Sequence, residues 1–151
     1  MLIPDVKLVD LNGENHILSQ LLYDNHLNLV LFYNTNCLGC TGRAIPHAYH
    51  LNNEYDFINL VVIHSSFGNQ SFSTSDILSI FTRKSSPFPI YCESSHQLYD
   101  FFQCEGTPHW ILLDGKENLI YSFFGSQENT KHKLYLAITE YKNKYIDQEK
   151  E

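Results

Sequence analysis

Residues 27–41 of the chain read LNLVLFYNTNCLGCT. The nearly continuous apolar run Leu27 to Tyr33 is typical of a strand that is buried on both faces of a sheet. A Cys-x-x-Cys pair, Cys37 and Cys40, follows the run, and we expect a helix from this pair to about Tyr55. The sequence therefore predicts a buried strand that leads into a helix through two cysteines.

This placement of the two cysteines favours redox chemistry. Free backbone N–H groups and the helix dipole stabilise an anion at a helix N-terminus, which favours a thiolate at Cys37. The thiolate is the attacking species in disulfide exchange. Cys40 lies one turn further on, where it can displace a partner from a mixed disulfide. Gly39 is expected to let the backbone turn tightly between the two cysteines.

Two other interpretations of the cysteine pair are weaker. A structural disulfide over so short a loop would constrain the unfolded chain little. Zinc usually needs four ligands, and Cys92 and Cys104 do not form a second close pair. His47 is about 10 Å along a helix from Cys40, too far to share an ion with it, so we interpret His47 and His50 as surface or half-buried histidines.

Outward from this segment, strands alternate with helices and the chain ends in a hairpin and a last helix. An Asn12-Gly13 turn predicts an N-terminal β-hairpin as well. The fold class expected is α/β, with a mixed central sheet flanked by helices, in a single domain over residues 1–151. The expected strands are 7–11, 15–18, 27–33, 58–64, 90–92, 109–114 and 119–125, and the expected helices are 19–23, 37–55, 75–84, 95–102 and 128–145.

Composition narrows the class of protein further. The chain has 151 residues and a formal net charge of −7, which disfavours a general nucleic-acid binder. No apolar run is long enough to predict a membrane span. No signal peptide is visible in residues 1–10, so we expect a cytoplasmic protein, or an extracytoplasmic one if a leader has been removed.

Several of these segments together resemble the thioredoxin superfamily, in particular the TlpA/ResA-like thiol-disulfide oxidoreductases. Residues 4–13, PDVKLVDLNG, are similar to the opening hairpin of that group. The strand followed by Cys37-Leu38-Gly39-Cys40 is similar to its redox motif. Gly106-Thr107-Pro108, before the expected strand 109–114, resembles the cis-proline loop of the family.

The resemblance implies a thioredoxin-like fold and a thiol-disulfide oxidoreductase with no cofactor. It implies that Cys37 and Cys40 are the catalytic residues. It also implies that Thr107 and Pro108 pack beside them and help to bind the substrate backbone. The implied partners are protein thiols or disulfides and an unidentified redox partner.

The chain departs from the family pattern at four positions. Asn36 stands where the family often has Trp, and Pro46 lies six residues after the second cysteine where the family usually has five. Leu31 and Arg43 occupy positions where some members carry a buried acid. Arg43 is instead a candidate for stabilising a thiolate by its charge.

Three functions follow as hypotheses. The first is disulfide exchange with protein substrates, in a direction that the sequence leaves open. The second is a peroxiredoxin-like peroxidase with Cys40 as the peroxide-reactive thiol, although Tyr33 and Cys37 stand where that family has Pro and Thr. The third is a protein that binds a soft metal through its thiols. Cys92 and Cys104 are expected to be small buried hydrophobic side chains.

Overall fold

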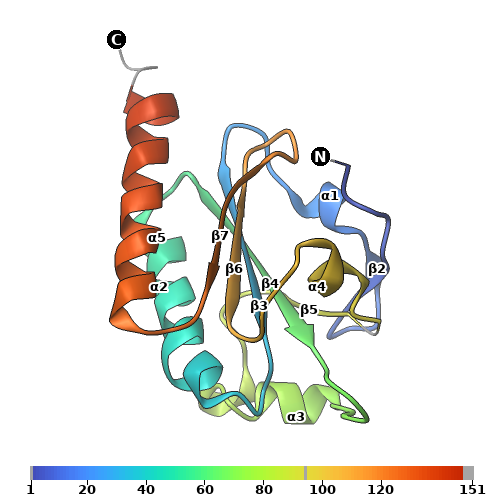
Figure 1. The fold of residues 1–151 in the computed structure, drawn as a ribbon. Coiled ribbons are helices and arrows are strands. Elements are labelled where there is room, and N and C mark those ends of the chain that lie inside the picture. Colours follow the sequence, from blue (N-terminus) through green and yellow to red (C-terminus); the bar gives the residue numbers. More distant parts are fainter. Residues whose placement is uncertain (1, 94, 148–151) are drawn as a thin grey trace.

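A seven-stranded mixed sheet forms the centre of the computed structural model, which describes residues 2–93 and 95–147 (Figure 1). The strands lie in the order β2-β1-β5-β4-β3-β6-β7, and β3, β4 and β5 run parallel. Their bounds are β1 Leu8–Asp10, β2 Asn15–His16, β3 Leu27–Tyr33, β4 Ile58–Ser65, β5 Ile90–Glu93, β6 His109–Leu113 and β7 Leu119–Phe124. The predicted α/β class with a mixed sheet is confirmed. The domain predicted over residues 1–151 includes residues 1, 94 and 148–151, which lie outside the described residues.

Helices cover both faces of the sheet. In Figure 1, α2 (Ile45–Glu54) and α5 (Glu128–Tyr141) lie together on one side, and α1 (Leu18–Leu21) and α4 (Gln97–Phe101) lie on the other. Two buried apolar clusters match this division, one containing residues of α2 and α5 and the other Leu18 and Leu98. Among the described residues, no helix combines the length and the apolar character that crossing a bilayer requires.

Strand β3 shows why the run 27–33 is apolar without alternation. All seven of its residues are buried. Leu29, Leu31 and Tyr33 pack in the cluster under α2 and α5, whereas Val30 and Phe32 pack in the cluster on the opposite face. Because successive side chains of a strand point to opposite faces, a strand with a core on each side needs nearly continuous apolar residues. The exception, the buried Asn28, is hydrogen-bonded to the backbone of Tyr23 and Asp114.

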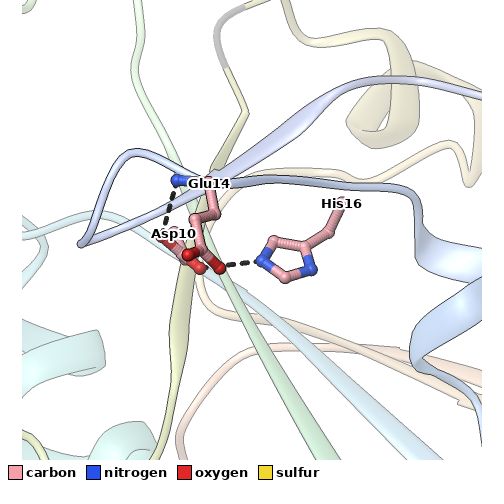
Figure 2. A group of neighbouring side chains, drawn as sticks. All are labelled: Asp10, Glu14 and His16. Atoms are coloured by element: carbon pink, nitrogen blue, oxygen red, sulfur yellow. Dashed lines mark hydrogen bonds and ion pairs between the residues drawn. The ribbon is translucent and has the colours of Figure 1, made fainter.

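The N-terminal hairpin is held by the Asp10 carboxylate (Figure 2). Its Oδ1 accepts hydrogen bonds from the backbone N–H groups of Asn12 and Glu14, each at 2.9 Å. Its Oδ2 lies 2.8 Å from Nε2 of His16, a contact that lowers the pKa of Asp10. These bonds fix the turn at Asn12 and Gly13, where Gly13 adopts a φ of +83°. The predicted hairpin is confirmed, with strands shorter than expected.

Two helix starts differ from the sequence-based prediction. Helix α3 spans Thr74–Leu78, begins one residue before the expected start at residue 75, and is capped by Ser73. The Ser73 hydroxyl accepts from the Asp76 N–H while the Asp76 carboxylate accepts from the Ser73 N–H, so Asp76 completes a capping box with the earlier serine. The chain then forms a turn and the short 3₁₀ segment η2 (Thr82–Lys84) in place of one long helix. Helix α1 likewise begins one residue before the expected start at residue 19.

The helix after the cysteine pair contains a π-helical turn, η1 (Cys40–Ala44), before α2 begins. The Ile45 N–H donates to the carbonyl of Cys40, five residues earlier. A π turn accommodates one residue more than an α-helical turn. The extra residue accounts for the position of Pro46, six residues after Cys40 where five is usual in the resembled family. A second π turn, η3 (Lys142–Ile146), extends α5.

Candidate active site

The cysteine pair lies beyond the end of β3, after a three-residue loop that is held from two sides. The Asn34 side chain donates to the Ser65 carbonyl at 2.7 Å, and its Oδ1 accepts from the Asn36 N–H at 2.9 Å. The Thr35 N–H donates to Nε2 of the buried His64 at 3.1 Å. These bonds fix the direction in which the chain reaches Cys37.

The two thiols differ in accessibility. Cys37 is half-buried, whereas Cys40 is 0% exposed. The Cys40 N–H donates to Sγ of Cys37 at 3.2 Å, and Sγ of Cys37 lies 3.4 Å from the carbonyl oxygen of Thr107. Solvent and a large partner can therefore approach Cys37, while Cys40 is protected behind it.

Burial also sets the acidity of the inner thiol. Burial, with a smaller contribution from the hydrogen bond with Cys37, raises the pKa of Cys40 to about 12. Burial likewise raises the pKa of the neighbouring Tyr33. Cys40 therefore stays protonated at neutral pH, and it can act as a nucleophile only after losing its proton to a nearby group or to water.

The loop that faces Cys37 contains a cis peptide bond between Thr107 and Pro108, as the resemblance led us to expect. The Pro108 carbonyl accepts from the Gly125 N–H at 2.9 Å, which ties the loop to the end of β7. Gly106 has a φ of +142°, and a Cβ there would lie 2.8 Å from the Phe124 ring. Both the backbone angle and the lack of space explain a glycine at this position.

Gly39 has a different role from the one predicted. Its backbone is ordinary right-handed helix, with φ −65° and ψ −28°, so no tight turn needs it. A Cβ at this position would instead lie 2.7 Å from Oγ of Ser126. The expectation of a special backbone turn was wrong, and close approach of the β7–α5 loop explains the glycine.

The other candidate residues on this helix lie along one side of it. Arg43 is exposed and donates from Nη1 to Oε1 of Gln127 at 2.7 Å. His47 is half-buried with its ring edge-on to Trp110, and the exposed His50 pairs with Glu54 at 2.7 Å. The prediction that both histidines are surface or half-buried side chains is confirmed. That Arg43 tunes a thiolate stays a prediction, since the contact found for its guanidinium is with Gln127.

The remaining two cysteines are free and half-buried. Cys92 packs against the cluster that contains Cys40, and Cys104 packs against the cluster on the opposite face. Burial raises the pKa of Cys104 to about 12 and also raises that of Cys92. This environment agrees with the prediction of small hydrophobic side chains, and the sheet separates the two sulfurs from each other.

A group of three potential metal ligands lies on the N-terminal hairpin. Within residues 2–93 and 95–147, the group of three such side chains is Asp10, Glu14 and His16, whose ligand atoms lie within 4.8 Å of one another. The Asp10 oxygens already accept the hydrogen bonds that shape the hairpin (Figure 2).

Sequence reasoning missed three residues that position the site. His64 and Asn34 hold the loop before Cys37, and Ser126 borders Gly39. His64 and Asn34 are polar residues at the ends of apolar strands, and this pattern was the available signal that they contribute to the site. Ser126 had none, because its partner lies far away in the chain.

Comparison with solved structures identifies the fold as thioredoxin-like, as predicted. No family model matches the chain, and no curated protein matches its sequence. The exposed lipoprotein thioredoxin Etrx1 from Streptococcus pneumoniae superposes with a TM-score of 0.70 at 17% identity, over 90% of this chain and 99% of that one. A thiol-disulfide isomerase from Corynebacterium glutamicum gives 0.68 at 20% identity, over 89% and 93%. The MTB protein dsbF gives 0.70 at 13% identity, over 93% and 99%.

Proposed function

We propose that this protein is a thiol-disulfide oxidoreductase that exchanges disulfides with protein substrates through Cys37 and Cys40. One observation carries the proposal: an accessible thiol, Cys37, whose sulfur accepts a backbone N–H and faces the carbonyl of a cis-proline loop, stands in front of a buried thiol. The fold that this chain shares with proteins described as thioredoxins and thiol-disulfide isomerases supports it.

In the reducing direction, the Cys37 thiolate attacks one sulfur of a substrate disulfide. The substrate S–S bond breaks, one substrate thiolate leaves, and a mixed disulfide forms at Cys37. Cys40 then loses its proton and attacks Sγ of Cys37, which releases the second substrate thiolate. Two electrons pass from the protein dithiol to the substrate, and a separate dithiol must restore the reduced protein. The oxidising direction is the same sequence in reverse.

Thr107 and Pro108 complete the proposed site. The Thr107 carbonyl lies 3.4 Å from Sγ of Cys37, so a peptide chain bonded to that sulfur would pass beside this loop. We assign to Thr107 the role of holding the substrate backbone, and to the buried Pro108 that of shaping the loop.

Trapping of the mixed disulfide tests the proposal. In a Cys92→Ser/Cys104→Ser background, Cys40→Ser is expected to accumulate a covalent complex with a peptide disulfide, because no thiol remains to release it. Mass spectrometry of the non-reduced protein measures this complex. The matched variant Cys37→Ser should form little complex, since its remaining thiol is buried. Absence of any adduct with Cys40→Ser would refute the proposal.

The direction of electron flow follows from the reduction potential of the Cys37–Cys40 pair in the same background, measured in glutathione buffers. A value of about −270 mV, that of thioredoxin, would indicate a reductase. A value of about −120 mV would indicate an oxidant of substrate thiols. A pair that forms no disulfide at all would contradict the proposed function.

A further inference from the structure

A cavity of about 440 Å³ lies beside the cysteine pair, between the start of α2 and the start of α5. These two helices are neighbours on one face of the sheet (Figure 1). We call it the α2–α5 cavity; its lining includes Arg43, His47, Trp110, Ser126 and Lys131. Ser126 also borders Gly39, the residue before Cys40. The cavity therefore adjoins the proposed redox site.

The cavity continues along α2 from the cysteine pair. Gly39, Arg43 and His47 follow one another at intervals of four residues, which places them on successive turns of one side of the helix. Arg43 and His47 line the cavity. A substrate bonded to Cys37 can therefore extend into it without crossing the helix.

Two cations, Arg43 and Lys131, and one carboxylate, Glu128, border this cavity, which leaves an excess of positive charge there in a chain whose net charge is −7. Arg43 donates to Gln127, a neutral side chain, so this hydrogen bond does not offset the positive charge of the guanidinium. Within the described residues, the ion pair found for Lys131 is with Glu128 at 3.9 Å, near the limit for such a contact, and the Glu128 side chain is 92% exposed. A long, exposed ion pair such as Lys131–Glu128 contributes little free energy. An additional anion in the cavity would therefore be attracted by both Arg43 and Lys131.

His47 adds a polar atom without a partner. Its Nε2 is shielded from solvent, and no hydrogen-bond partner for it is found within residues 2–93 and 95–147. Burial lowers the pKa of this imidazole. Buried polar atoms are costly to leave unpaired, so a turn of the half-buried ring toward the cavity, where Nε2 can donate to a ligand oxygen, would relieve that cost.

We propose that the α2–α5 cavity binds a carboxylate of the disulfide substrate, held by Arg43 and Lys131 and within reach of His47. The inference rests on the proposed function and names a substrate class for it: disulfides that carry an acidic group close to the sulfur attacked by Cys37. The carboxylate belongs either to an acidic residue of a peptide or to a small thiol compound.

Helix geometry sets the spacing of that acidic group. Arg43 lies six residues after Cys37, at most about 9 Å along the helix axis at the ~1.5 Å per residue of an α-helix, because the π turn η1 between them holds more residues per turn. An extended peptide advances about 3.3 Å per residue. The acidic residue should therefore lie about two or three positions from the cysteine of the substrate.

The test compares single-turnover rates of reduced protein with peptide disulfides that differ in one residue. Peptides with Asp, Asn or Lys at the second or third position from the cysteine are the probes for a peptide carboxylate. Oxidised glutathione and its ethyl ester are the probes for a small compound. We expect the Asp peptide, the acidic glutathione, or both, to react about fivefold faster than the neutral counterpart, as charge-assisted hydrogen bonds would produce.

The variant Arg43→Gln/Lys131→Gln is expected to abolish this ratio. Lys116→Gln/Lys142→Gln is the matched control, because it removes the same charge at the far ends of the β6–β7 hairpin and α5. If Arg43 acted only on the reactivity of Cys37, its loss would change the rates for all probes equally and leave the ratio intact.

The possible results separate the two proposals. A preference for acidic probes that requires Arg43 and Lys131 supports the carboxylate site. Whether the peptides or the glutathione compounds show this preference identifies the source of the carboxylate. Equal rates for acidic and neutral probes, or a preference that survives in the double variant, overturn the site while disulfide exchange stands. No reaction with any probe would refute disulfide exchange itself.

Discussion

At the scale of single residues, His64 links pH to the stability of the loop before Cys37. The side chain is 1% exposed, and burial lowers its pKa from 6.5 to about 4. Its Nε2 accepts from the Thr35 N–H, which requires the neutral ring. Between these two pKa values the unfolded chain takes up a proton that the folded protein does not. The free energy of unfolding therefore falls as the pH drops through this range, by up to about 3 kcal/mol from His64 alone.

We predict that His64→Gln removes most of the pH dependence of the free energy of unfolding. Glutamine can accept the hydrogen bond from the Thr35 N–H, but its side chain does not titrate. Urea unfolding at a series of pH values between about 7 and about 4.5 measures it. His132→Gln, at an exposed position on α5, is the control and should keep the slope of the wild type. His47 and His109, whose pKa values are also lowered by burial, leave a residual slope in every variant. An unchanged slope in His64→Gln would contradict the assignment.

At the scale of elements, the π turn η1 contains an exposed glycine that no contact explains. A Cβ at Gly42 would meet no atom of residues 2–93 or 95–147 within 4 Å. Glycine costs a helix about 1 kcal/mol relative to alanine, so we predict that Gly42→Ala raises the free energy of unfolding by about 0.5–1 kcal/mol. The melting temperature should then rise by about 2–4 °C for each kcal/mol gained in the free energy of unfolding.

Gly39→Ala is the matched comparison for this prediction. Its backbone is also helical, but its new Cβ would lie 2.7 Å from Oγ of Ser126. The serine hydroxyl would have to rotate away, so the helix gain should be offset and the melting temperature should rise less than in Gly42→Ala. A loss of stability in Gly42→Ala would mean that the π turn itself requires glycine.

The elements also show what local sequence can and cannot predict. The run 27–33 identifies a central strand because burial on both faces needs continuous apolar residues. The start of α3 was expected one residue too late because Ser73 and Ser75 are both favourable capping residues, and the reciprocal hydrogen bonds between Ser73 and Asp76 select the earlier start. The role of Gly39 depends on Ser126, a contact that no local pattern encodes.

The same distinction applies to the site at the scale of the whole molecule. Cys37, Cys40 and the cis Thr107–Pro108 bond are recognisable because short motifs surround them. The residues that hydrogen-bond to these motifs come from other strands. His64, near the end of β4, accepts from the loop before Cys37, and Gly125, after β7, donates to Pro108. Such partners follow only from the order of strands in the sheet, which a single sequence specifies weakly.

That strand order predicts which parts of the molecule open first. Strand β3 pairs with β4 and β6 and is buried along its whole length, whereas β2 is two residues long and pairs with β1 at the sheet edge. We expect the amides of β3 to exchange with solvent only through global unfolding, and those of β2 to exchange orders of magnitude faster through local opening.

Hydrogen exchange of the reduced protein, followed by mass spectrometry of its peptides, measures this difference. The exposed loop residues 68–71 serve as the fast-exchanging reference. Because Cys37 follows the slowest-exchanging strand, the geometry of the dithiol should persist through fluctuations that release the hairpin. If β2 exchanged as slowly as β3, the hairpin would belong to the same cooperative unfolding unit as the core. The geometry of the dithiol would then depend on the whole sheet and not on its central strands alone.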